Sequence, residues 1–244
     1  QSIAAMTFGS QTIDKVDKIF GPGNQFVTIA KLLATKYNVS IDMPAGPSEL
    51  MVVSDNTGRS DFIASDLLSQ AEHGEDSQVI LVTNSEKLAN DTLKEVQKQS
   101  KKLNRFQTIE KVLKNSKIIL LENEDELIKF SNFYGPEHLI ICLRNKDSID
   151  KIVNAGSVFI GNYSAESIGD YASGTNHTLP TNGYVRQYSG VNLDSFLKSI
   201  TYQEISEKGI LNIGPVVETL SKAEGLEAHK EAVSIRLKYI KNKG

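Results

Sequence analysis

The chain contains 244 residues, a length that corresponds to one large domain or two small ones. Hydrophobic residues make up 39% and charged residues 23%, and the net charge of −3 does not favour a basic nucleic-acid-binding protein. The apolar runs are far shorter than the roughly 18 residues of a membrane span. Because Cys142 is the one cysteine, no intrachain disulfide can form, and we expect a buried thiol in a reducing, cytoplasmic compartment.

The first 47 residues are expected to form the end of one Rossmann-like α/β domain. They contain an apolar run at 16–20, the turn Gly21-Pro22-Gly23-Asn24, a helical pattern over 25–37 and a Pro/Gly-rich linker at 43–47. The chain opens on a helix-like segment, with neither an initiator Met nor a signal-peptide charge pattern. We therefore expect the sequence to be part of a longer protein.

Residues 48–191 alternate short apolar runs with amphipathic helical patterns. Strands are predicted over 48–54, 77–83, 117–121, 138–143 and 157–160, and helices over 60–73, 85–114, 124–133 and 146–154. This alternation is typical of βαβ units, and the continuous apolar runs favour strands that are covered on both faces. The sequence therefore predicts an α/β fold, a Rossmann-like parallel sheet with flanking helices.

Residues 192–244 show helical patterns without a convincing strand, and the clearest of these runs over 223–241. We expect a small helical C-terminal extension that serves dimerisation.

A polar helix face that ends at His73 is the first candidate for a site. Gln70 and His73 are three residues apart and share one helix face, and Asp66 lies one turn earlier. Such a face suits a metal or substrate site in a crevice at the strand ends. Two ligand-type residues are a weak motif, however, and a solvated helix end capped by Gly74 explains these residues equally simply.

Glu137 and His138 follow Tyr134-Gly135-Pro136 and enter an apolar strand. A carboxylate beside an imidazole can supply general acid and base groups. The alternative is a turn whose polar residues merely bound the strand, and the sequence leaves both readings open.

A polar, glycine-containing loop at 169–177 follows the last predicted strand. Loops at the carboxyl ends of parallel strands are where α/β proteins place ligands, so we expect this loop there. Asp170 could ligate a metal and His177 could contact a substrate, although an ordinary surface loop has the same composition. His229, on the final helix, is by itself most simply a surface or interface histidine. No GxGxxG, Walker, CxxC, HExxH or GxSxG motif is present.

Taken together, the segments closely resemble the histidinol dehydrogenase family. The resemblance extends from Gln1 to the last helix and covers the carboxyl-terminal part of that family, rather more than half of it. The segments that carry it, in chain order, are VDKIFGPGNQFVTIAK, IDMPAGPSEL, DLLSQAEHG, YGPEHLII, AGSVFIG, GDYASGTNHTLPT and EAHKEAV.

The resemblance implies a zinc- and NAD-dependent oxidoreductase of histidine biosynthesis, which oxidises L-histidinol through L-histidinaldehyde to L-histidine. It implies a homodimer in which His229 and Glu224 reach the partner's site, and NAD contacts at Gln1 and Asn24. Glu137 and His138 would be the acid/base pair. The implied zinc ligands are Gln70, His73, Asp170 and His229. The implied substrate contacts are Ser48, Gln70, His73, His138, Asp170, His177, Glu224 and His229.

Within that expectation, His138 takes the alcohol proton and Glu137 activates the water that attacks the aldehyde. Two alternatives remain open at this point. A zinc hydrolase would use Glu137 with metal-bound water and would change no nicotinamide absorbance. A non-catalytic ligand-binding or oligomerisation fragment would show no turnover even with the missing part supplied. If the chain is a fragment, we expect weak or absent dehydrogenase activity with the zinc ligands retained.

Overall fold

The computed structural model describes residues 1–44 and 46–243, and the chain forms two compact units, Gln1–Phe196 and Leu197–Gly244. Ala45, in the predicted Pro/Gly-rich linker, lies outside the described residues. Among the described helices, none has the length and apolar character that crossing a membrane requires. The assignment of residues 1–47 to a further domain, and the boundary at 191, stay predictions.

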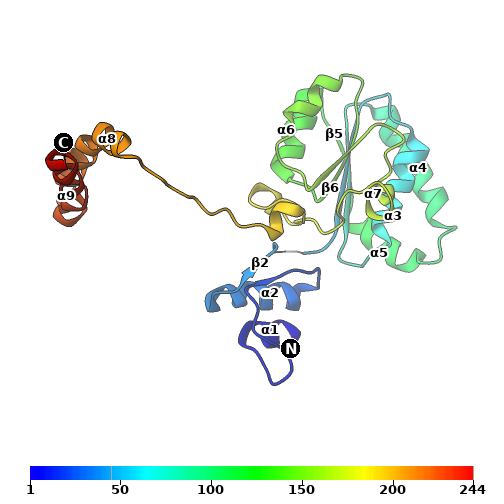
Figure 1. Ribbon diagram of the computed structural model, residues 1–244. Helices are drawn as coiled ribbons and strands as arrows, with labels where there is room; N and C mark the ends of the chain where they lie inside the picture. The colour runs from blue at the N-terminus through cyan, green and yellow to red at the C-terminus, as the bar shows by residue number, and fades with distance from the viewer. Residues whose placement is uncertain (45, 244) are drawn as a thin grey trace. The chain divides into compact units, whose positions relative to one another are not determined.

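A five-stranded parallel sheet forms the centre of the first unit (Figure 1). The predicted Rossmann-like sheet is confirmed, and each predicted strand agrees with the observed one within a residue at each end. The strand order is β5-β4-β3-β6-β7. The strands are β3 (Glu49–Ser54), β4 (Gln78–Thr83), β5 (Lys117–Leu120), β6 (His138–Cys142) and β7 (Ser157–Ile160).

Helices cover both faces of this sheet, with α6 (Glu124–Tyr134) on one side and α3 (Ser60–Ala71), α4 (Glu86–Ser100) and α5 (Phe106–Asn115) on the other (Figure 1). The single helical region predicted over 85–114 is therefore two helices. The intervening segment, 101–105, contains one apolar residue, Leu103, and it is exposed, so nothing there holds a helical turn against the core.

The strand residues alternate between two apolar clusters. Leu50 and Val52 pack with α3, α4 and α5, whereas Met51 and Val53 pack with α6. This period of two is the one that a sheet buried on both faces requires.

Shorter helices complete the unit: η2 (Lys146–Lys151), α7 (Glu166–Tyr171), η3 (Tyr184–Arg186) and η4 (Leu193–Phe196). The helix predicted over 146–154 is wrong in type and length, because it is the 3₁₀ helix η2. Ile149 and Ile152 both pack on the core, and their spacing of three matches the three residues per turn of a 3₁₀ helix.

Residues 1–44 form a small layer built on one pair of parallel strands, β1 (Lys18–Ile19) and β2 (Ser40–Ile41). The helices α1 (Ser2–Phe8), α2 (Gln25–Ala34) and η1 (Thr35–Tyr37) accompany them. Ile19, Ala34 and Val39 form its buried core.

A buried ion pair joins the parts of this layer. Lys31 and Asp42 are almost fully buried and contact each other. Lys31 Nζ donates to the carbonyl of Gly21 at 2.8 Å, and Gly21 N–H donates to Asp42 Oδ2 at 2.8 Å. The pair therefore fixes the start of the turn that carries Asn24.

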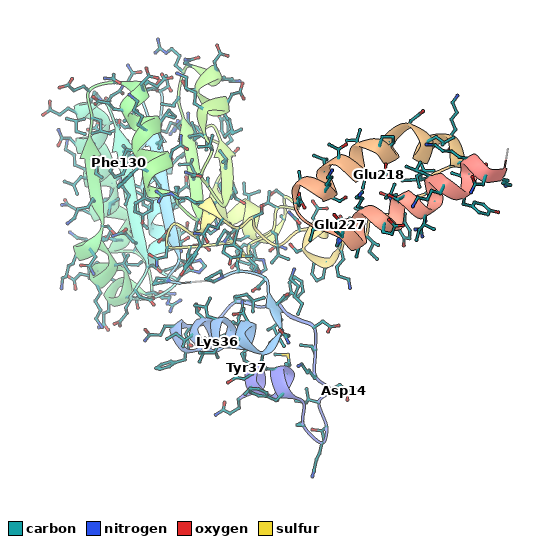
Figure 2. All side chains as sticks on the ribbon, turned by 90° about the vertical axis from the view of Figure 1, so that its left-hand side faces the viewer. Asp14, Lys36, Tyr37, Phe130, Glu218 and Glu227 are labelled. Atoms are coloured by element: carbon teal, nitrogen blue, oxygen red, sulfur yellow. The ribbon has the colours of Figure 1, made fainter. Side chains whose placement is uncertain are left out.

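The second unit contains two helices, α8 (Glu207–Ala223) and α9 (Glu227–Lys243), which pack as a hairpin. Figure 2 labels Glu218 on α8, whose carboxylate accepts a hydrogen bond from Ser234 of α9, and Glu227 at the start of α9. Gly214 lies against Leu237, where a Cβ would come within 2.9 Å of Leu237 Cδ1. The predicted helical extension is confirmed, and no strand occurs in its described residues.

Candidate active site

A cavity of about 390 Å³ in the first unit brings together most of the residues that the sequence singled out. The turn at Pro22 and Gly23 and residues of the segment 178–181 form part of its wall. The predicted residues that line the cavity are Ser48, Gln70, His73, Glu137, His138, Asp170 and His177. Elements far apart in the sequence therefore converge on one site, while the roles of these residues stay predictions.

The cavity lies at the amino-terminal edge of the sheet, which corrects the expected position. Ser48 precedes β3, and His138 is the first residue of β6. Because the helix in a βαβ unit runs back along the sheet, the last turn of α3 carries Gln70 to this edge. In the same way α7 returns from the end of β7 and brings Asp170 to within 3.5 Å of His138. The expectation that Asp170 lies at the carboxyl ends of the strands is wrong.

Gln70 is the most unusual polar residue of the cavity. Its side chain is fully buried, and neither Oε1 nor Nε2 has a hydrogen-bond partner in the described part of the chain. An unsatisfied buried polar group costs about 1–3 kcal/mol, and such groups are rare in native proteins. Both polar atoms of the amide are therefore available to a group that binds in the cavity that Gln70 lines.

Three further side chains add to this donor set. Ligand atoms of His73, Glu166 and Asp170 all lie within 4.8 Å of one another, close enough to share one cation. Glu166, four residues before Asp170 on α7, is buried and accepts a hydrogen bond of 3.0 Å from Ser69. Burial raises its pKa to about 7. Mixed nitrogen and oxygen donors suit a borderline divalent cation such as Zn²⁺.

Sequence reasoning missed Glu166 and selected Asp66 on the neighbouring helix. Asp66 is not among the described residues that line the cavity. The i,i+4 spacing of Glu166 and Asp170 was the available signal, because these positions share one helix face.

Glu137 and His138 are both buried at the base of the cavity. The backbone N–H of Glu49 donates to Glu137 Oε2 at 2.8 Å, and His138 Nδ1 lies 3.3 Å from the carbonyl of Glu49. Since a carbonyl only accepts, this contact favours the proton on Nδ1 and leaves Nε2 for other partners. Nε2 lies 3.5 Å from Asp170 Oδ1, and the imidazole stacks on Phe159 with ring centres 6.0 Å apart.

Opposing effects act on the charge of His138. Burial lowers its pKa, but the carboxylates of Asp170 and Glu137 outweigh burial and raise the pKa to about 10. The same contact lowers the pKa of Asp170. A cation that neutralised this carboxylate charge would shift His138 towards its neutral form.

A second cavity of about 610 Å³ shares Gly23, Gly46, Ser48 and His73 with the first. Asn24 lines it and also caps α2, with its side-chain oxygen accepting from Phe26 N at 3.1 Å. A ligand that extends from the first cavity would therefore reach Asn24.

The remaining predicted residues lie outside these two cavities. Gln1, at the start of α1, is exposed and is not among the described lining residues. Glu224 ends α8, and His229 lies in the first turn of α9; both are exposed in the second unit.

The chain is similar throughout to one family of proteins. The family described as histidinol dehydrogenase matches residues 1–237. The histidinol dehydrogenase of Bacteroides fragilis is 55% identical over 244 residues, which cover 99% of this chain and 56% of the relative. The chloroplastic histidinol dehydrogenase of Arabidopsis thaliana is 52% identical over 247 residues, covering 100% of this chain and 53% of the relative.

A solved structure agrees with these relatives. The crystal structure of histidinol dehydrogenase from Elizabethkingia anophelis has a TM-score of 0.96 and 57% sequence identity, and the match covers 99% of this chain and 56% of that one. The chain thus spans a little over half the length of the relatives that it matches.

Proposed function

The chain belongs to the histidinol dehydrogenase family, and we propose that it supplies the metal- and substrate-binding part of an enzyme that oxidises L-histidinol through L-histidinaldehyde to L-histidine with NAD⁺. The observation that carries the proposal is the convergence of Gln70, His73 and Asp170 with Glu137 and His138 on one cavity. Metal-type donors and an acid/base pair are the two components that this reaction requires.

The orphaned amide of Gln70 and the clustered donors of His73 and Asp170 fit a zinc ion. In the proposed homodimer His229 of a second copy completes the ligands, beside Glu224 as a substrate contact. Zn²⁺ bound there would orient the nitrogens of histidinol and neutralise carboxylate charge around His138.

The chain's own residues carry the proton transfers. His138, with its proton on Nδ1, accepts the alcohol proton at Nε2, and bound NAD⁺ would supply the hydride acceptor. Glu137, held by the backbone N–H of Glu49, accepts a proton from the water that attacks the aldehyde carbon. Oxidation of the resulting hydrate to the carboxylic acid would release one proton and one hydride, for which a second NAD⁺ would be the acceptor. Ser48 and His177 contact the substrate from opposite segments of the lining, and Asn24 and Gln1 are proposed NAD⁺ contacts.

The second unit supports the proposed dimer. Two packed helices bury little apolar surface by themselves, and several large apolar side chains of this unit are exposed. A second copy is the occupant that would cover them and would also bring His229 to a site. Those on the helical hairpin are Leu211, Ile213, Val216, Val217, Leu220, Leu226, Ile235 and Tyr239.

The test joins the chain to the amino-terminal part of a relative and follows NADH formation with histidinol and zinc. We expect NADH from both histidinol and histidinaldehyde, with loss of both activities on adding a chelator. Product formation without NADH would instead identify a zinc hydrolase. No turnover would leave the chain a ligand-binding or oligomerisation module.

A further inference from the structure

Glu49, the first residue of β3, contacts both members of the proposed acid/base pair through its own peptide groups. Its N–H donates to Glu137 Oε2 at 2.8 Å, and its carbonyl lies 3.3 Å from His138 Nδ1. The pairing of Leu50 with His138 in the sheet places the two segments side by side. Neither the motifs nor the spacing of the sequence identified Glu49.

The side chain of Glu49 is half-buried and lies in a polar group on the α6 side of the sheet. Its Oε1 accepts a hydrogen bond of 3.0 Å from the backbone N–H of Asn182, in the segment that follows His177. Its Oε2 is buried and has no hydrogen-bond partner among the described residues. The hydroxyl of Tyr134, in the same group, is already committed to Gln78 Oε1 at 2.6 Å.

The half-buried Glu49 and the buried Glu137 thus present two carboxyl groups with unequal surroundings. Glu137 Oε2 receives a backbone N–H and lies 3.6 Å from His138 Nδ1, both of which stabilise a negative charge. Glu49 accepts the N–H of Asn182 at Oε1, but its buried Oε2 has no hydrogen-bond partner among the described residues. When two acidic groups share a buried site, the less supported one keeps its proton.

We propose that Glu49 is a positioning residue that keeps a proton on its own carboxyl group, so that no second negative charge lies beside Glu137, and that its backbone N–H orients Glu137 as the base. The assignment of Glu137 as the base rests on the proposed function, whereas the protonation of Glu49 does not. The same carboxyl anchors the segment 178–182 to the start of β3, so its charge state also affects how firmly this wall of the cavity is held.

The pKa of Glu49 agrees with a proton on its carboxyl group. Burial raises the pKa of Glu49 from 4.5 to about 7, the N–H groups of Asn182 and Glu137 oppose that rise, and the negative Glu137 adds to it. His138 contributes a smaller opposing effect, and Glu49 in turn raises the pKa of Tyr134. The titratable groups that face Glu49 are therefore His138 on β6, Glu137 in the loop before β6, and Tyr134 on α6.

The sign of the pH dependence follows from linkage. A carboxyl whose pKa is higher in the folded than in the unfolded chain binds its proton more tightly when folded. The Glu49 contribution to stability is therefore present below pH 4.5, is lost as the pH rises, and is gone above about 7. Glu49→Gln keeps the oxygen that accepts from Asn182 and removes the titration.

The first test needs neither substrate nor cofactor. Carboxyl ¹³C resonances of the labelled 244-residue chain are followed against pH, and the free energy of unfolding is measured from pH 4.5 to 8 for wild type, Glu49→Gln and the exposed control Glu110→Gln. Glu49, Glu166 and Asp66 all have a pKa of about 7, so we expect several resonances with midpoints near pH 7, one of which is absent in Glu49→Gln. We also expect a stability loss with rising pH in wild type and the control, and a smaller loss in Glu49→Gln, where Glu166 and Asp66 still contribute. A Glu49 midpoint near 4.5, or the same pH slope in Glu49→Gln, would overturn the proposal.

The second test uses the enzyme completed with a relative's amino-terminal part. Glu49→Gln should retain aldehyde oxidation below pH 7 and lose the change that wild type shows above it. An unaltered pH profile would reject the role towards Glu137 even if Glu49 titrates as expected. Absence of activity in every variant would count against the proposed function and leave the first test decisive for Glu49.

Discussion

The backbone N–H of Glu49 donates a hydrogen bond of 2.8 Å to Oε2 of Glu137. This contact joins the starts of two neighbouring parallel strands, so the register of the sheet itself orients the carboxylate. The site is built on rigid strand ends, which explains how a buried acid and a buried imidazole can be held beside each other.

Separate substitutions of the acid/base pair should affect different half-reactions. His138→Gln should slow oxidation of histidinol, since Nε2 no longer accepts the alcohol proton, and Glu137→Gln should mainly slow oxidation of histidinaldehyde. The expected losses are about 10²- to 10⁴-fold, the usual range for general acid/base groups. Single-turnover rates with each substrate, in the enzyme completed with a relative's amino-terminal part, provide the measurement. Unchanged aldehyde turnover in Glu137→Gln would contradict this division.

Replacement of Gln70 should separate stability from metal binding. Gln70→Leu removes a buried amide with no partner, so the metal-free chain should become more stable, by up to about 1–3 kcal/mol. Zinc affinity should fall by at least about 10-fold, a loss seen even for groups that only support metal ligands. Chemical denaturation and zinc titration calorimetry measure the two effects. The exposed control Gln107→Leu on α5 should leave zinc affinity unchanged; an equal loss there would refute the assignment.

The buried pair of Lys31 and Asp42 should matter more than any exposed ion pair. Lys31→Met leaves Asp42 buried without its partner and frees the carbonyl of Gly21, so we expect a stability loss of about 3–5 kcal/mol. Thermal and urea unfolding provide the measurement. Lys151→Met, which breaks an exposed pair with Asp125, is the matched control and should change stability little. Similar losses in both variants would show that burial is not the cause.

A methyl group at Gly156 should disturb the site directly. A Cβ there would lie 2.5 Å from the carbonyl oxygen of Glu137, so the backbone has to move at Gly156 or at Glu137. Gly156→Ala should cost about 1–3 kcal/mol of stability and weaken histidinol binding. Gly209→Ala, in the first turn of α8, brings a Cβ to 3.2 Å from Ile205 Cγ2 and near no backbone atom, so it should change stability little. Wild-type histidinol affinity in Gly156→Ala, measured by calorimetry, would show that Glu137 is not displaced.

The sheet was predictable because each strand is a short, continuous apolar run, which is typical of strands in βαβ units that are covered on both faces. Gln70 and His73 were grouped on one face of a helix predicted over 60–73, but α3 ends at Ala71, so Gln70 lies in its last turn and His73 lies two residues beyond it. The edge of the sheet on which Asp170 lies was not predictable, because the loop after a strand and the return helix α7 look alike in sequence. Glu49 and Glu166 were missed for a related reason: a lone glutamate shows its burial only once neighbouring elements pack around it.

Diffraction at the zinc absorption edge, on crystals of the zinc-loaded 244-residue chain, measures the position of the ion. We expect one anomalous peak between Gln70, His73 and Asp170, with His229 of a second copy as the fourth protein ligand. A peak elsewhere, with the amide of Gln70 still unpaired, would contradict a shared metal and substrate site.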